Sequence, residues 1–134
     1  MCESKVIKLM FEERTISILA YNLETVLAEK METVIARGVE NTRLRDYYDL
    51  YILPNEYTHV ISKEQFEEAL LATSKKRNSI QLIAEGNRIL KEIEDSEVMQ
   101  ELWKGYQKKF SYAEDISWRM VMDSIEKLFE QALQ

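Results

Sequence analysis

The fold is decided first by residues 22–37, which read NLETVLAEKMETVIAR. Apolar side chains recur in this stretch every three or four residues, which places them on one face of an α-helix. Asn22 can cap the first turn, Glu24 suits the positive end of the helix dipole, and Gly38 suits the position after the last turn. The stretch therefore predicts a helix whose inner face is formed by Leu23, Val26, Leu27, Met31, Val34 and Ile35.

Lys30 stands out because it projects among the apolar residues of this helix, whereas Glu29 and Glu32 are expected to point toward solvent. An ammonium group in that place has three outcomes. The side chain snorkels to water, it pairs with a buried carboxylate, or it faces a cavity that an anion enters. The first two are the commoner outcomes, and the sequence alone leaves all three open.

A second charged stretch follows at residues 41–54, which read NTRLRDYYDLYILP. It predicts a short helix from about Thr42 to Ile52, with Asn41 as the cap and Pro54 as the stop. Four charges crowd two turns of this helix, namely Arg43, Arg45, Asp46 and Asp49. A carboxylate beside guanidinium groups stays ionised, which suits it to hold a metal or, if its site tunes it, to accept a proton from a hydroxyl. The alternative is an Arg–Asp ladder on a solvated face.

Three blocks of the sequence together resemble the AbiEii/AbiGii toxin family of nucleotidyltransferases. They are residues 20–30 (AYNLETVLAEK), residues 41–50 (NTRLRDYYDL) and residues 69–77 (ALLATSKKR), in the order and approximate spacing of the family. The resemblance continues weakly through residues 103–110 and the last helix, so it covers most of the chain. The first two blocks carry most of its specificity.

The resemblance implies an enzyme of the polymerase-beta-like superfamily, the toxin of an abortive-infection or toxin–antitoxin pair. Such toxins transfer nucleotides from a nucleoside triphosphate with Mg²⁺, several relatives act on tRNA ends, and an antitoxin protein is the implied partner. Lys30 matches the lysine expected to contact triphosphate, and Asp46 and Asp49 match the two acids of the Arg/Lys-Asp block. Arg43 and Arg45 are then candidates to neutralise triphosphate or RNA phosphates.

One motif of the family has no counterpart in this sequence. The metal-binding motif is a Gly-Ser turn followed by an acidic strand, and none of the three glycines, Gly38, Gly86 and Gly105, precedes a serine. Nucleotidyl transfer depends on positioned metal ions that stabilise the attacking and leaving oxygens. We therefore expect no metal ligands in this chain. We expect it to correspond to the C-terminal part of such an enzyme and to be inactive alone. Its missing partner is then a catalytic N-terminal domain. Mg²⁺ and triphosphate are expected only in the complete enzyme.

Composition favours one mainly helical domain spanning residues 1–134. The chain is 46% hydrophobic and has three glycines and one proline, which leaves few tight turns for a β-rich fold. Residues 1–21 are predicted to form a short β-hairpin, and residues 22–134 a bundle of about five to six helices, the C-terminal part of an α+β nucleotidyltransferase. Further helices are predicted from a capping box at Ser62, over Ile80 to Ile93, after a cap at Asp95 or Ser96, and from a capping box at Ser111.

Charge and the rarer residues exclude several classes of site. The net charge of -6 argues against a broadly basic nucleic-acid surface, so any RNA contact is local. Candidate patches are residues 75–77 (KKR) and residues 108–109 (KK) beside Tyr106 and Phe110, although lysines at a helix end commonly just complement the dipole. The single cysteine and the single histidine assemble neither a disulfide nor a zinc site. With no apolar run long enough for a membrane span, a soluble cytoplasmic protein is expected.

Two hypotheses of function remain from the sequence. The first is the C-terminal portion of a nucleotidyltransferase toxin, which contributes Lys30 and the Asp46 region to a triphosphate site completed elsewhere. The second is a non-catalytic helical interaction module that an antitoxin or partner subunit grips. Lys30 and the Arg-Asp block together favour the first, because an interaction module does not need them.

Overall fold

The computed structural model describes residues 22–132, and this part of the chain is built of helices. Seven α-helices and two short 3-10 helices follow one another, and no strand occurs between residues 22 and 132. The elements are α2 (Leu23–Arg37), η1 (Gly38–Glu40), α3 (Leu44–Glu56), α4 (Lys63–Lys76), α5 (Ile80–Ala84), α6 (Gly86–Asp95), α7 (Glu97–Lys109), η2 (Ser111–Ala113) and α8 (Trp118–Ala132).

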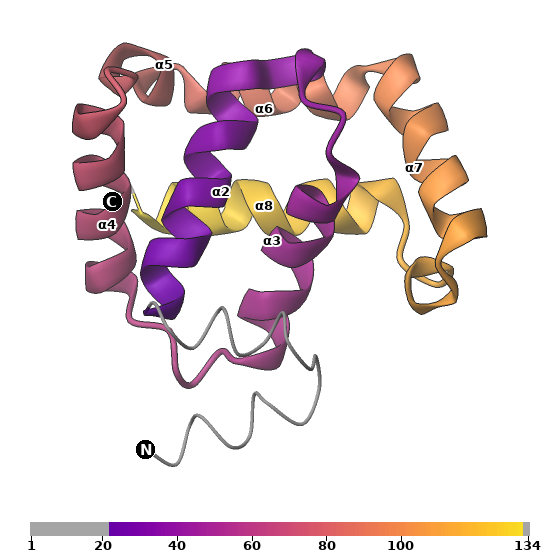
Figure 1. The fold of residues 1–134 in the computed structure, drawn as a ribbon, viewed down its shortest axis with the longest axis horizontal. Helices are drawn as coiled ribbons and strands as arrows, with labels where there is room; N and C mark the ends of the chain where they lie inside the picture. The colour runs from indigo at the N-terminus through magenta and orange to yellow at the C-terminus, as the bar shows by residue number, and fades with distance from the viewer. Residues whose placement is uncertain (1–21, 133–134) are drawn as a thin grey trace.

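Helix α2 occupies the middle of the arrangement (Figure 1). Helices α3 and α4 pack on either side of it, and α8 crosses behind the three and contacts both α3 and α4. Helix α6 lies along one side of α8, and α7 stands at the far end near α3. The buried side chains of these helices form one cluster. This arrangement brings the two charged stretches of the sequence, on α2 and α3, side by side.

Several predicted helix ends are confirmed in atomic detail. The side chains of Asn22, Ser62 and Ser96 each accept a hydrogen bond from a backbone N–H of the following turn. At the other end of α2, Gly38 has a φ of 57°, and its N–H donates to the carbonyl of Val34. Left-handed backbone of this kind favours glycine because it lacks a Cβ.

Both predicted ends of α3 are wrong. The helix begins at Leu44 with Arg43 at the cap position, because the buried Asn41 accepts the N–H of Arg43 in a turn that precedes the helix. Pro54 lies inside the helix, which continues to Glu56. Proline removes one donor near the helix end. The last turn is nevertheless held, since Asn55 donates to the Oγ of Ser124 on α8.

The helix predicted over Ile80 to Ile93 is two helices with a break at Glu85. Helix α6 starts at Gly86, and the ring of Phe129 on α8 packs directly against that glycine. A Cβ added at Gly86 would lie 2.2 Å from the ring, so only glycine allows this close approach. Packing against α8 therefore decides where the helix breaks. The helical spacing of apolar residues continues across this point and gives no sign of a break.

The final helix does not start at the predicted Ser111 capping box. Residues Ser111–Ala113 form η2, and α8 starts at Trp118 with the hydroxyl of Ser117 accepting the N–H of Met120. The intervening turn is fixed because Trp103 and Gln107 both donate to the carbonyl of Ile116, at 2.8 and 2.7 Å. The inner face of α8 is apolar, with Val121, Ile125, Phe129 and Ala132 buried and Leu128 packed at its edge.

The mainly helical fold class is thus confirmed, with seven α-helices among residues 22–132 in place of five to six. The hairpin predicted for residues 1–21 lies outside the described residues, and a single domain over residues 1–134 stays a prediction. Within the described part, every helix is too short or too polar to cross a bilayer.

Candidate functional site

Lys30 lies on the side of α2 that faces α3, and its ammonium group contacts two carboxylates. Its Nζ is 3.2 Å from Oδ1 of Asp46 and 3.1 Å from Oδ2 of Asp49. The lysine side chain is 22% exposed, so the group is within reach of solvent. Of the three outcomes open from the sequence, the structure shows pairing with buried carboxylates.

Asp46 and Asp49 are three residues apart on α3, so they project from the same side of the helix. Both are buried, with 4% and 1% of their surface exposed, and the solvated Arg–Asp ladder is therefore wrong for these acids. Asp46 is in the first turn of α3, where the helix dipole stabilises negative charge. We call Lys30, Asp46 and Asp49 the lysine–aspartate cluster.

Arg43 and Arg45 flank this cluster and are exposed. Arg43 is at the cap position of α3, and its backbone N–H is held by Asn41. The guanidinium group of Arg45 lies beside the hydroxyl of Tyr106 on α7. The five predicted site residues thus gather around the start of α3, with three in direct contact and the two arginines on the surface.

Tyr47 is a neighbour of the cluster that the sequence analysis did not single out. It is fully buried, and its hydroxyl has no hydrogen-bond partner among residues 22–132. Burial, and to a smaller extent the charge of Asp46, raise its pKa well above the usual range, so the phenol stays protonated. No pattern in the sequence separates this tyrosine from an ordinary core residue.

Metal-ligating side chains do not cluster in the described part of the chain. No group of three or more His, Cys, Asp or Glu side chains between residues 22 and 132 is placed to hold a metal ion. Asp46 and Asp49 are buried and contact the ammonium of Lys30.

The basic patches predicted from the sequence differ in what they contact. At the end of α4, Arg77 reaches across to α2 and pairs with the buried Glu32 at 2.6 Å. The predicted exposure of Glu32 is therefore wrong, because α4 covers that side of α2. At the end of α7, Lys109 instead lies over the ring of Phe110, 5.6 Å from its centroid.

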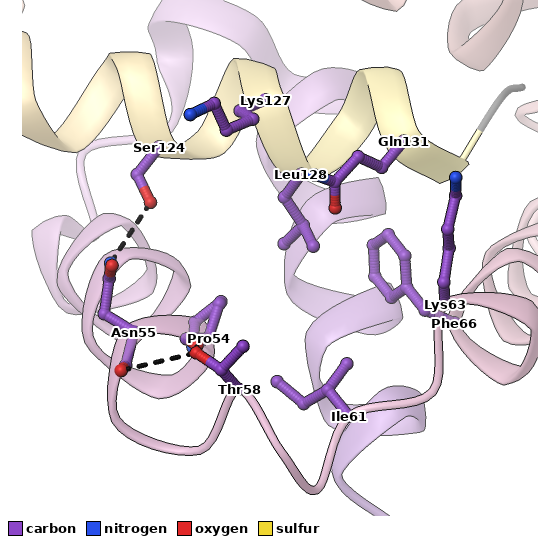
Figure 2. Close-up of a pocket in the computed structure, with 10 residues that line it drawn as sticks. All are labelled: Pro54, Asn55, Thr58, Ile61, Lys63, Phe66, Ser124, Lys127, Leu128 and Gln131. Carbon is purple, nitrogen blue, oxygen red and sulfur yellow. Dashed lines mark hydrogen bonds between the residues drawn. The ribbon is translucent and has the colours of Figure 1, made fainter.

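A pocket of about 260 Å³ is lined by residues outside the lysine–aspartate cluster (Figure 2). It lies between the end of α3, the loop into α4 and one side of α8. Its walls combine apolar side chains with two lysines and several uncharged polar groups, and none of the five predicted site residues lines it. The lining residues are Pro54, Asn55, Thr58, Ile61, Lys63, Phe66, Ser124, Lys127, Leu128 and Gln131.

Comparison with known proteins identifies the family. No curated protein and no solved structure matches the chain. The family model described as "Nucleotidyl transferase AbiEii toxin, Type IV TA system" matches residues 2–134. The match covers nearly the whole sequence, including both helices of the lysine–aspartate cluster. The chain therefore belongs to the AbiEii family of nucleotidyl transferase toxins from type IV toxin–antitoxin systems.

Proposed function

We propose that residues 22–132 supply the lysine and the acids of a nucleotidyltransferase site, and that transfer also requires metal ligands from outside these residues. The observation that carries this proposal is the lysine–aspartate cluster. Two helices bring a partly exposed ammonium group to within 3.2 Å of two buried carboxylates, at the positions matching the family's motif residues. This is the only group of the candidate site residues in direct contact.

Each residue has a distinct role in the proposed site. The ammonium group of Lys30 contacts the triphosphate, since it carries the positive charge and remains partly exposed. Asp46 is the principal acid, which accepts a proton or orients the lysine, and Asp49 fixes the position of Lys30 from the other side. Arg43 and Arg45 neutralise phosphate groups at the surface, where a guanidinium fork can bind two oxygens at once.

The metal is proposed only for the complete enzyme. Bound Mg²⁺ would supply positive charge that neutralises the charge developing on the transferred phosphate. The described residues offer no cage for it, and the sequence has no Gly-Ser turn. We therefore propose that the chain is inactive alone and that a catalytic segment with the metal motif completes it. The family implies an antitoxin protein as the partner of this chain. We also propose that tRNA accepts the transferred nucleotide and that the protein is cytoplasmic.

Labelled nucleotide transfer tests this function. The chain is mixed with tRNA, Mg²⁺ and α-³²P-labelled nucleoside triphosphates, alone or with a second polypeptide that carries the family's Gly-Ser turn and acidic strand. We expect transfer only in the mixture and its loss in Lys30→Ala, with Lys76→Ala, an exposed lysine at the end of α4, as the matched control. Transfer by the chain alone would contradict the requirement for a second segment. Unchanged transfer with Lys30→Ala would remove the assigned site.

The second candidate function is a non-catalytic module that binds a protein partner. It is favoured by the pairing itself, because an ammonium held by two buried carboxylates also joins α2 to α3 as a structural ion pair would. In that case the antitoxin binds the chain equally well when Lys30 is replaced, provided that the variant is folded. Titration calorimetry of the antitoxin into wild-type and Lys30→Ala protein separates the two functions.

A further inference from the structure

A chain of aromatic rings runs from the core to the surface at the end of α7. Trp103 is buried and stacks on Tyr106, with ring centroids 5.1 Å apart and planes at 21°. Tyr106 contacts Phe110 at 4.7 Å, and Phe110 contacts Tyr112 at 5.3 Å. Tyr112 is 46% exposed. The chain of rings therefore reaches the surface at Tyr112.

These outer rings are held in place from several sides. Tyr48 on α3 packs against Tyr112 at 4.8 Å between centroids. The hydroxyl groups of Tyr106 and Tyr112 form a hydrogen bond of 2.9 Å. A surface fixed in this way loses little conformational entropy when a flat ligand stacks on it.

Positive charge surrounds the same surface. The ammonium of Lys109 lies over Phe110, and the guanidinium of Arg45 lies beside Tyr106. Lys108 is exposed, and no carboxylate of residues 22–132 forms an ion pair with it or with Lys109. Arg45 immediately precedes Asp46 in the first turn of α3, so this turn borders both the aromatic surface and the lysine–aspartate cluster. We call Arg45, Tyr106, Lys109, Phe110 and Tyr112 the aromatic platform.

We propose that the aromatic platform binds unpaired bases of single-stranded RNA, with its cations on the adjacent phosphates. Aromatic rings stack on every base, and lysine or arginine beside them follows the backbone, which is the combination that binds single strands without sequence preference. The inference rests on the proposed function in one respect. The bound RNA strand is taken to be the acceptor of nucleotide transfer, whose end enters beside Asp46.

Binding of a fluorescein-labelled 12-nucleotide oligo(A) RNA, followed by anisotropy without triphosphate or Mg²⁺, tests the platform. We expect Tyr112→Leu to weaken binding about ten-fold, because a stacking ring is lost, and Tyr112→Phe to bind within two-fold of wild type. Lys108→Gln combined with Lys109→Gln should weaken binding, whereas the control pair Lys75→Gln and Lys76→Gln, at the end of α4, should not. Circular dichroism checks the fold of each variant.

Three results would overturn the proposal. The first is no binding by the wild-type chain, and the second is equal affinity of Tyr112→Leu and wild type. The third is an equal loss of affinity for the two lysine pairs, which would mean a general attraction of RNA to positive charge. Phe110→Leu provides a second ring variant if Tyr112→Leu does not fold. A duplex RNA competitor that displaces the oligonucleotide as well as unlabelled single strand would also contradict base stacking. Since the assay contains no triphosphate, intact binding with failed transfer would count against the proposed function alone.

Discussion

Helix α2 carries buried charged groups on two sides, and the two sides arrange them differently. Toward α4, the carboxylate of Glu32 pairs with one guanidinium, that of Arg77, at 2.6 Å. Toward α3, the ammonium of Lys30 is shared between two carboxylates, those of Asp46 and Asp49. The first contact is a one-to-one ion pair between helices, and in the second two buried acids share one lysine.

This difference separates a structural contact from a candidate site. A balanced ion pair needs no further explanation than the packing of two helices. Two buried carboxylates are costly to remove from water, and interacting buried charges occur at functional sites as well as in structural networks. The α3 side also holds the residues that the family resemblance singles out. The following predictions test the contrast, from the largest expected effect to the smallest.

Lys30→Met should have the largest effect on stability. It keeps the apolar stem but leaves two buried carboxylates without their ammonium, and we expect a loss of about 3 kcal/mol in the free energy of unfolding. Urea unfolding followed by circular dichroism measures it. Adding Asp46→Asn and Asp49→Asn to Lys30→Met should restore much of the loss, because neutral amides replace the charges. A loss that persists in the triple variant would assign the effect to packing.

Arg77→Met should cost less, about 2 kcal/mol, because it leaves one buried carboxylate in place of two. The arginine side chain is itself 42% exposed, which lowers the cost further through screening by solvent. The same unfolding experiment applies, with Glu32→Gln added to Arg77→Met as the compensating change. A loss equal to that of Lys30→Met would break the contrast between the one-to-one ion pair and the shared lysine.

Glu24→Gln examines the second buried acid of α2, whose partner carries no full charge. Its Oε2 accepts the backbone N–H of Ser62 at 2.6 Å, just before α4, so it also interacts with the positive end of that helix. We expect a loss of about 1 kcal/mol, since the amide keeps a hydrogen bond and loses the charge. Thermal unfolding of Glu24→Gln beside Glu64→Gln, an exposed acid of the same helix end, measures it.

Glu126→Gln should give the smallest effect, and that effect should depend on pH. Burial and, next, the neighbouring Glu94 raise the pKa of Glu126 to about 7. Because this pKa is raised above its unfolded value, the contribution of Glu126 to stability is complete below about pH 4.5 and declines as pH rises through 7. The melting temperature of Glu126→Gln should therefore exceed that of wild type at pH 8 and approach it at pH 5. A difference independent of pH would rule out this titration.

The sequence predicted most residues of the candidate site, but it did not predict their burial or their contacts with one another. Lys30, Asp46 and Asp49 were identified because charge interrupts an apolar face or crowds a short helix. That the two aspartates are buried, and that they share one lysine, depends on how α3 packs against α2, which no local pattern encodes. Tyr47 escaped notice for the same reason, since its environment comes from Asp46 and from contacts with other helices.

Local sequence by itself determined where α2, α4 and α7 begin, because a cap needs only one side chain within hydrogen-bond reach of the next turn. It also determined the mainly helical class through apolar spacing. Tertiary structure alone decided the break at Glu85, where the Phe129 ring occupies the space beside Gly86, and the late start of α8. It also decided the burial of Glu32, Asp46 and Asp49. The physical reason is that a cap is a contact within one turn, whereas burial and charge balance depend on residues that are distant in the sequence.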